Sequence, residues 1–229
     1  MRALPLAILL VLCTAASSAG DVSGKVLFHG TPPKPFLLMM NADPKCMAQH
    51  KGPVYAEDVL VNPNGTLRNV LVAVKTGLPS RKFDLPGKSA VLDQKGCQYH
   101  PHVLGVMAGQ EVEIINEDPT LHNVHSVSKA NPQFNIAQPR AGMKMSKRFE
   151  QAETFKVKCE VHPWMGAYIG VFTHPFFAVT GDDGSYTIRN LPPGDYTIEA
   201  WHERYGARTL SVKVTGPGPA TADFTYEAK

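Results

Sequence analysis

The 229-residue sequence lacks long hydrophobic runs after residue 19. No later stretch approaches the roughly 20 apolar residues that a membrane-spanning helix needs. A charge excess is also missing, because 23 basic side chains face 20 acidic ones, for a formal net charge of +3. So small an excess argues against nucleic acid as a partner. We therefore expect a mature chain that has no transmembrane segment and binds no nucleic acid.

Common catalytic motifs are missing as well. The sequence contains no phosphate-binding loop, no His-Glu-x-x-His zinc motif and no serine elbow. His202 lies beside Glu203, but no activated serine or free cysteine accompanies them. We therefore expect the protein not to be an enzyme.

Residues 1–19 resemble a cleavable export signal. Arg2 supplies the charged start, residues 3–12 form an apolar core too short to span a bilayer, and small residues precede a cleavage point after Ala19. The alternatives are an N-terminal anchor or a lipoprotein at Cys13, which the large Leu12 disfavours. We expect a periplasmic or secreted protein.

The sequence does contain four metal-ligand side chains at a characteristic spacing. Cys159, His162 and Met165 follow one another at i, i+3 and i+6, and His122 lies upstream. A thiolate, two imidazoles and a thioether form the ligand set of a blue-copper site. One tight loop between two strands can supply three of them, and a neighbouring strand the fourth. The alternative is a buried core thiol, a hydrogen-bonded loop histidine and a core methionine.

Strands flank these candidate ligands. Apolar and polar residues alternate over residues 109–116 and 154–159, and residues 167–172 follow the loop as a further strand. Pro163 stiffens the loop, because proline fixes its own φ and restricts the residue before it. A stiff site changes little between Cu(II) and Cu(I), which favours fast electron transfer.

The same residues resemble a known family. Asn116-Glu117-Asp118-x3-His122-Asn123-Val124-His125, followed by Cys159-x2-His162-Pro163-x-Met165, is similar to the small cupredoxins of the amicyanin and plastocyanin type. The resemblance covers about residues 89–173. It implies a Greek-key β-sandwich with one mononuclear type 1 copper, held by His122, Cys159, His162 and Met165. It also implies single-electron transfer between transient redox protein partners.

The C-terminal residues resemble a second family. Residues 179–188 and 191–201 each place an alternating strand after a turn, at Gly184 and at Pro192-Pro193-Gly194. This pattern is similar to the carboxypeptidase regulatory-like family, a transthyretin-type β-sandwich, although the usual first Asp of its turn is displaced here. Residues 24–33 and 67–74 resemble earlier strands of the same family.

These two resemblances imply an all-β chain with a nested layout. Residues 20–87 and 174–229 would form one regulatory-like sandwich, and the copper domain, residues 88–173, would be inserted into it. Insertion is tolerated where the chain ends of the host lie close together at a surface loop. The competing layout has two sequential domains divided near residue 174.

Cysteines are few. Of the four in the sequence, Cys13 leaves with the signal, so that Cys46, Cys97 and Cys159 remain. An odd number of cysteines in an oxidising compartment indicates one disulfide and one thiol that serves another purpose. If Cys159 binds metal, Cys46 and Cys97 are left for a disulfide. The alternative is two free buried thiols.

Three further histidines could belong to a second metal site. His100 and His102 form an alternating pair, but we expect them to lie on the strand before Gly109 without a ligand role. His125 should lie on the strand face opposite His122, outside the copper shell. The sequence leaves a second site at these residues open.

We expect electrons to leave through the outer ring edge of His162, which should reach the surface between Pro163 and Trp164. Such an apolar patch suits weak redox encounters, which bury little area. The alternative is that Trp164 packs inward.

Two other functions stay open. Met143 and Met145 could pass Cu(I) to or from His122 in a copper-delivery protein, although alternating methionines on one strand face favour the core. Alternatively, the protein could be a metal-stabilised adhesion or carbohydrate-binding module, with glycan or protein contact through the C-terminal sandwich.

Overall fold

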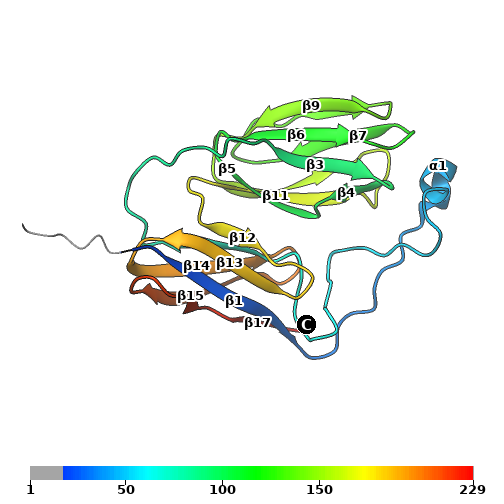
Figure 1. Ribbon diagram of the computed structural model, residues 1–229. Helices are drawn as coiled ribbons and strands as arrows, with labels where there is room; N and C mark the ends of the chain where they lie inside the picture. Colours follow the sequence, from blue (N-terminus) through cyan, green and yellow to red (C-terminus); the bar gives the residue numbers. More distant parts are fainter. Residues whose placement is uncertain (1–17, 229) are drawn as a thin grey trace, which may run out of the picture.

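A computed structural model describes residues 18–228 and shows two stacked β-sandwiches (Figure 1). The predicted signal peptide falls almost entirely on residues 1–17, which lie outside the described residues. In the described part of the chain, regular structure is strand apart from two short helical segments, so the predicted all-β class is confirmed. Within residues 18–228, no helix is long and apolar enough to cross a bilayer.

The first sandwich, here the terminal sandwich, is built from strands near both ends of the chain. One sheet has the order β13-β1-β16 with β17 also pairing with β1, and the other has the order β12-β2-β14-β15. The strands are β1 (Gly20–His29), β2 (Leu71–Thr76), β12 (Phe177–Val179), β13 (Ser185–Leu191), β14 (Gly194–His202), β15 (Gly206–Val214), β16 (Ala220–Thr221) and β17 (Phe224–Glu227).

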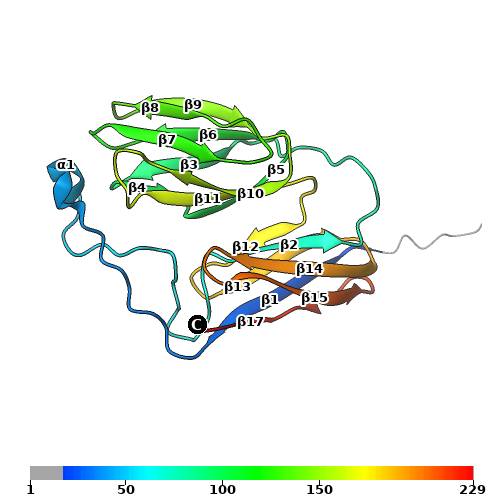
Figure 2. The same ribbon diagram turned by 180° about the vertical axis from the view of Figure 1, so that it is seen from behind.

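Pairing in the terminal sandwich joins residues that are far apart in the sequence. β1 pairs antiparallel with β13 through Val22 and Ile188, and β2 pairs antiparallel with β14 through Val74 and Ile198. These four side chains belong to one buried cluster. The chain leaves this sandwich after β2 and returns to it at β12 (Figures 1 and 2). The predicted boundaries at residues 88 and 173 fall in these two connections.

The second sandwich, here the central sandwich, is formed by the residues between those connections. One sheet has the order β5-β11-β10-β7-β8 and the other has the order β4-β3-β6-β9. The strands are β3 (Ala90–Lys95), β4 (Gln98–His100), β5 (Val103–Met107), β6 (Glu111–Asn116), β7 (His122–Val127), β8 (Asn135–Gln138), β9 (Met143–Arg148), β10 (Glu153–Lys158) and β11 (Gly166–Phe172).

Alternation along β10 shows how the sequence fills the core of the central sandwich. Phe155 and Val157 are buried and their neighbours Thr154 and Lys156 are exposed, as the period of two in a strand requires. Cys159 directly follows β10 and continues its buried face. The predicted metal ligand therefore enters the core on the same side as the apolar residues before it.

The segment between β1 and β2, residues 30–70, is here called the connecting segment. It runs along the end of the central sandwich and carries the helical segments η1 (Met40–Ala42) and α1 (Pro44–Met47) (Figure 2). Asp43 caps α1, because its side chain accepts a hydrogen bond from the Lys45 amide at 2.8 Å. Cys46 of α1 forms a disulfide with Cys97, as predicted.

Contacts between the two sandwiches are both polar and aromatic. His102 of the central sandwich pairs with Glu203 of the terminal one. The rings of Tyr168 and Trp201 lie 5.2 Å apart in an edge-to-face arrangement. Gly170 permits close packing, because a Cβ atom there would lie 2.2 Å from a methyl carbon of Leu71.

Candidate metal centre

Two strands and one loop position the predicted ligands. His122 opens β7, and Cys159 follows β10, which pairs with both β7 and β11. The loop from β10 to β11 closes on itself, because the Cys159 amide donates to the Met165 carbonyl at 3.1 Å. The Met165 amide donates in turn to the His162 carbonyl at 2.9 Å. Backbone hydrogen bonds thus fix the loop that carries three of the four candidate ligands.

The structure brings three of these side chains together in the core. Ligand atoms of His122, Cys159 and His162 all lie within 4.8 Å of one another. The two Nδ1 atoms of the imidazoles are 3.1 Å apart, and the Cys159 sulfur lies 3.8 Å from Nδ1 of His162. The exposed fractions of the three residues are 0%, 3% and 2% in sequence order. The cluster is therefore almost fully shielded from water.

Met165 is also buried, with an exposed fraction of 1%. Its side chain belongs to the hydrophobic cluster that contains Cys159, and Trp164 packs against that cluster. The structure thus places the thioether in the same core as the thiol. Its role as a fourth ligand stays a prediction.

Each imidazole of the cluster donates a hydrogen bond to a carboxylate through the ring nitrogen that points away from the cluster. Nε2 of His122 donates to Asp118 at 2.7 Å, and Nε2 of His162 donates to Asp43 at 3.1 Å. A carboxylate accepts only, so these contacts place a proton on each Nε2 and leave Nδ1 as the ring nitrogen that faces the cluster. Two Nδ1 atoms 3.1 Å apart need a proton or a metal cation between or beside them, because two bare lone pairs would repel each other. This is the arrangement by which proteins orient histidines toward a metal.

The same contacts set the charge states of the cluster. Burial lowers the pKa of His122, but the hydrogen bonds with Asp118 and Cys159 outweigh it, so the pKa of His122 is raised. For Cys159, burial raises the pKa, but its side-chain hydrogen bonds with His122 and His162 outweigh burial and bring the pKa to about 6. Cys159 is therefore poised to be a thiolate near neutral pH, which is the form that binds metals.

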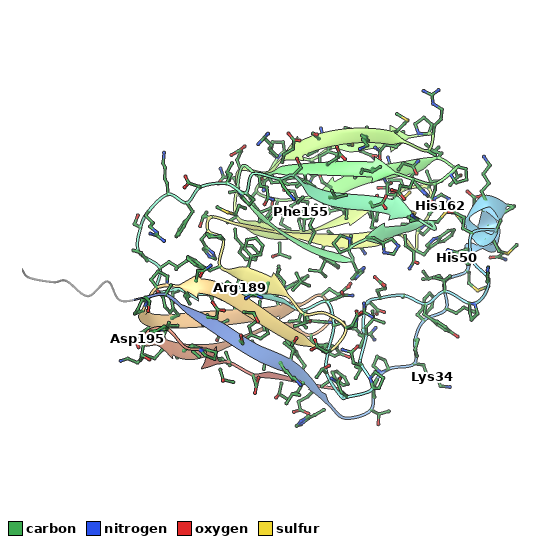
Figure 3. All side chains as sticks on the ribbon, in the orientation of Figure 1. Lys34, His50, Phe155, His162, Arg189 and Asp195 are labelled. Carbon is green, nitrogen blue, oxygen red and sulfur yellow. A yellow bond between two sulfur atoms is a disulfide. The ribbon has the colours of Figure 1, made fainter. Side chains whose placement is uncertain are left out.

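The disulfide lies directly against the cluster. Asp118 accepts hydrogen bonds from the amides of Gly96 and Cys97 at 2.8 and 2.7 Å, so the carboxylate behind His122 is fixed by the turn that carries Cys97. The Cys46 sulfur lies 3.5 Å from Nε2 of His162. The predicted exposure of the His162 ring edge is therefore wrong. The disulfide holds α1 beside His162 (Figure 3), and Asp43 covers the same ring edge as the hydrogen-bond partner of Nε2.

The predicted docking residues differ in their exposure. Pro163 is exposed, whereas Trp164 is half-buried. The indole nitrogen of Trp164 donates to the Cys97 carbonyl at 3.0 Å, and its ring lies 5.1 Å from that of His162. Trp164 thus packs between the ligand loop and the disulfide, and Pro163 is the more exposed of the two.

The other histidines lie outside the cluster. His125 pairs with Glu160 at the surface of the central sandwich. His102 pairs with Glu203 in the contact between the sandwiches, and His100 is exposed. Among residues 18–228, none of the three belongs to a group of His, Cys, Asp or Glu side chains that could share a metal ion.

The methionines of β9 lie on one face of that strand. Met143 and Met145 are half-buried and alternate with exposed residues. Met145 packs against the hydrophobic core of the central sandwich. This placement matches the core role that the alternation favours.

Sequence reasoning missed the two carboxylates. Asp118 lies four residues before His122, and that spacing within the Asn116-Glu117-Asp118 run was the one available signal. Asp43 has no such signal, because it reaches His162 from the connecting segment, far away in the sequence. Its contact depends on the path of that segment and on the Cys46–Cys97 disulfide.

The donor set fits copper. A thiolate and two imidazoles suit copper and zinc, whereas hard cations require oxygen ligands. Cys97, Asp118 and His122 also lie close together, but the Cys97 sulfur is bonded to Cys46 and cannot act as a thiolate ligand. The group of His122, Cys159 and His162 is thus the candidate centre.

Comparison with solved structures finds partial similarity to copper proteins. A copper-containing nitrite reductase from Thermus scotoductus SA-01 is 20% identical over 42% of this chain, with a TM-score of 0.34. This chain spans only 25% of that reductase. A purple cupredoxin from Nitrosopumilus maritimus is 23% identical over 36% of this chain and 99% of its own, with a TM-score of 0.32. A Cu(I) form of an amicyanin variant is 24% identical over 44% and 97% of the two chains, with a TM-score of 0.34.

The family match found from the sequence covers the C-terminal part of the chain, from the ligand loop through β11 to the terminal sandwich. No curated protein matches the chain. The family model that matches begins at His162, inside the ligand loop, and ends at Glu227, the last residue of β17. Residues 162–227 therefore carry the signature of the carboxypeptidase regulatory-like domain.

Proposed function

We propose that the protein is an exported carrier of single electrons that holds one mononuclear copper ion. His122, Cys159 and His162 would be its main ligands, and Met165 would be the weak axial one. The proposal rests mainly on a buried thiol that lies beside two imidazoles whose Nδ1 atoms face each other. A carboxylate fixes each imidazole through its Nε2. A bound copper ion would supply reversible exchange between Cu(II) and Cu(I).

The residues of this chain provide a fixed and dry environment for that exchange. Asp118 and Asp43 orient the imidazoles, so their rings need not rotate when the charge at the centre changes. The backbone hydrogen bonds of the ligand loop fix the positions of Cys159 and Met165 relative to each other. A site that is already arranged for both charge states has a small reorganisation cost.

Several features support a carrier rather than an enzyme. The exposed fractions of the three central residues do not exceed 3%, and Asp43 and Cys46 cover the one ring edge that the ligand loop alone would leave open. A substrate would have to displace this cover, whereas an electron can pass through it. The disulfide supports an oxidising compartment, in agreement with the predicted export.

The first experiment adds Cu(II) to the purified apo-protein. A short-bonded thiolate ligand should give an intense visible thiolate-to-copper band and a narrow hyperfine splitting in electron paramagnetic resonance. The Cys159→Ser variant should lose the colour, and the matched surface variant His125→Ala should keep it. A weak band and an ordinary tetragonal spectrum in the wild-type protein would refute the blue-copper assignment.

Copper delivery and adhesion remain alternatives that the same preparation separates. A carrier should show a reversible redox couple and retain copper in both states, whereas a delivery protein should lose Cu(I) to a chelator. An adhesion module should bind its glycan or protein partner without metal. The half-buried position of Met143 and Met145 offers no support for a delivery route through these two side chains.

A further inference from the structure

We propose that the connecting segment carries a second, independent site for cuprous ion, with Met39, Met47 and His50 as its ligands. This site would lie on the solvent side of α1, whereas the proposed electron-transfer centre lies on its inner side. The inference goes beyond the proposed function and does not depend on it.

A cavity of about 410 Å³ opens beside α1. Its lining contains three of the chain's eight methionines together with one histidine. The thioether and imidazole side chains in this lining are those of Met39, Met40, Met47 and His50. They come from a short stretch of the connecting segment and line one cavity, and His50 lies beside α1 (Figure 3).

The exposure of these methionines distinguishes them from core methionines. Met39 and Met47 are 60% and 54% exposed, whereas Met40 in the same lining is 5% exposed. Burial of apolar area explains Met40, which belongs to the core of the central sandwich. Met39 and Met47 instead leave two flexible thioether side chains accessible at the rim of one cavity. Binding of a soft cation would give them a role.

His50 has the tautomer that a ligand needs. Its Nε2 lies 2.7 Å from the Gly96 carbonyl oxygen, which can only accept a hydrogen bond. The proton is therefore on Nε2, and Nδ1 keeps its lone pair. Metal-binding histidines characteristically donate their other ring nitrogen to a carbonyl or a carboxylate in this way. This contact is independent of the methionines and orients the imidazole as a metal ligand requires.

The chemistry of the lining selects the ion. Thioether sulfur is a soft ligand that favours Cu(I), and imidazole binds copper as well. No carboxylate lines the cavity, and Lys51 contributes a positive charge to it. Both features disfavour Ca²⁺ and Mg²⁺, which require several oxygen ligands. A soft monovalent cation suits neutral thioethers next to a lysine better than any divalent cation does.

The test is a Cu(I) titration in competition with the chelator bicinchoninate, carried out without oxygen and with ascorbate as the reductant. It uses the full chain with Cys159→Ser, which removes the proposed electron-transfer centre. We expect this variant to retain a single equivalent of Cu(I). Adding Met39→Leu and Met47→Leu should lower the affinity for that equivalent by about tenfold or more, about 1.4 kcal/mol. Leucine is close to methionine in volume, so the fold should tolerate both changes.

The matched control carries Met143→Leu and Met145→Leu, which removes two thioethers from β9. The proposal requires that this control bind Cu(I) as the Cys159→Ser parent does. Equal affinities of the two double-leucine variants, or no retained equivalent in the parent, would overturn the proposal. If Cys159→Ser does not fold, the wild-type chain serves instead, and the Met39 and Met47 changes should remove the second of two equivalents.

A spectroscopic readout adds the identity of the ligands. Ag(I) mimics Cu(I) and needs no reductant, and it should shift the ¹³C-labelled methyl resonances of two exposed methionines in the Cys159→Ser chain. His50→Gln should weaken Ag(I) binding, and His125→Gln should not. Methyl shifts confined to other methionines would contradict the assignment. A colourless centre with Cu(II) in the wild type would refute the electron-transfer proposal and leave this outcome unaffected.

Discussion

Each sandwich buries two histidines, and the two pairs differ in what holds their ring nitrogens. His174 and His202 are buried in the terminal sandwich, and His122 and His162 are buried in the central one. Nε2 of His174 donates to the Val74 carbonyl at 2.9 Å, and its Nδ1 accepts from the Phe176 amide at 3.2 Å. In the central pair, each Nε2 donates to a carboxylate and each Nδ1 faces the other imidazole.

The charge states of the two pairs diverge accordingly. Burial lowers the pKa of His174 and brings the pKa of His202 to about 4, so both are neutral near pH 7. Burial also lowers the pKa of His122 and His162, but hydrogen bonds with Cys159 and the carboxylates raise it above the ordinary value. Burial is therefore shared by structural and ligand-type histidines. The two kinds of histidine differ in the group that contacts the second ring nitrogen, Nδ1.

The largest expected effect comes from removing the disulfide, which ties α1 to the central sandwich only. Replacing both Cys46 and Cys97 by alanine should lower the free energy of unfolding of that sandwich by about 4 kcal/mol, because the open loop gains entropy when unfolded. Urea unfolding can be followed by the fluorescence of Trp164 alone in a Trp201→Phe background, since the chain has two tryptophans.

The matched reporter is Trp201 in a Trp164→Phe background, which follows the terminal sandwich. Its transition should move much less than that of Trp164 when the two cysteines are replaced. Equal shifts of both transitions would show that the two sandwiches unfold as one unit. An unchanged Trp164 transition would contradict the stabilising role of the disulfide.

The next expected effect is a dependence of the stability of the terminal sandwich on pH, through its buried His202. Burial brings the pKa of His202 to about 4 in the folded protein, against an ordinary value of 6.5, so the unfolded chain binds the proton more readily. The stabilisation from a neutral His202 is present above pH 6.5 and is lost as the pH falls toward 4, on the order of 3 kcal/mol in all. Urea unfolding between pH 7 and pH 4, followed by Trp201, should show this loss.

A His202→Gln variant provides the control, because glutamine does not titrate. Its stability at pH 7 should be lower, since the ring packs against Tyr205 and Tyr226. Its further loss between pH 7 and pH 4 should be clearly smaller than in the wild type. An identical slope in both proteins would show that another group controls the acid sensitivity.

A third effect concerns Asp118 and Asp43, the two carboxylates that accept hydrogen bonds from His122 and His162. Asp118 is fully buried and also accepts two backbone hydrogen bonds, whereas the side chain of Asp43 is 20% exposed. Asp118→Asn should lower copper affinity by about 10- to 100-fold, since it weakens the orientation of a ligand histidine. Asp43→Asn should have a smaller effect, because water can replace the lost contact. Chelator competition measures both affinities, and a larger loss in Asp43→Asn would reverse this order.

The contrast between Asp118 and Asp43 also shows what the sequence could and could not predict. Cys159, His162 and Met165 share one loop, and alternation marks the strands around them, so local patterns suffice for the centre. Asp118 lies within the same motif as His122, although nothing local assigns it a role. Asp43 reaches His162 across a long sequence separation. The cysteine count predicts that Cys46 meets Cys97, but it does not predict that α1 then covers His162.

The smallest expected effect comes from Glu153, a carboxylate of the central sandwich that lies outside the ligand cluster. It accepts hydrogen bonds from Ser128, Asn131 and the backbone between them, and these contacts outweigh the burial that raises its pKa and bring it to about 2. A lowered carboxyl pKa means that its stabilisation is complete above the ordinary value near 4.5 and is lost as the pH falls toward 2. Glu153→Gln should lower the free energy of unfolding at pH 7 by about 1–2 kcal/mol, because a charge-assisted acceptor is replaced by a neutral one. Copper affinity should stay at the wild-type value, in contrast to Asp118→Asn. If Glu153→Gln weakens copper binding as much as Asp118→Asn does, overall loosening of the sandwich rather than contact with a ligand histidine controls the affinity.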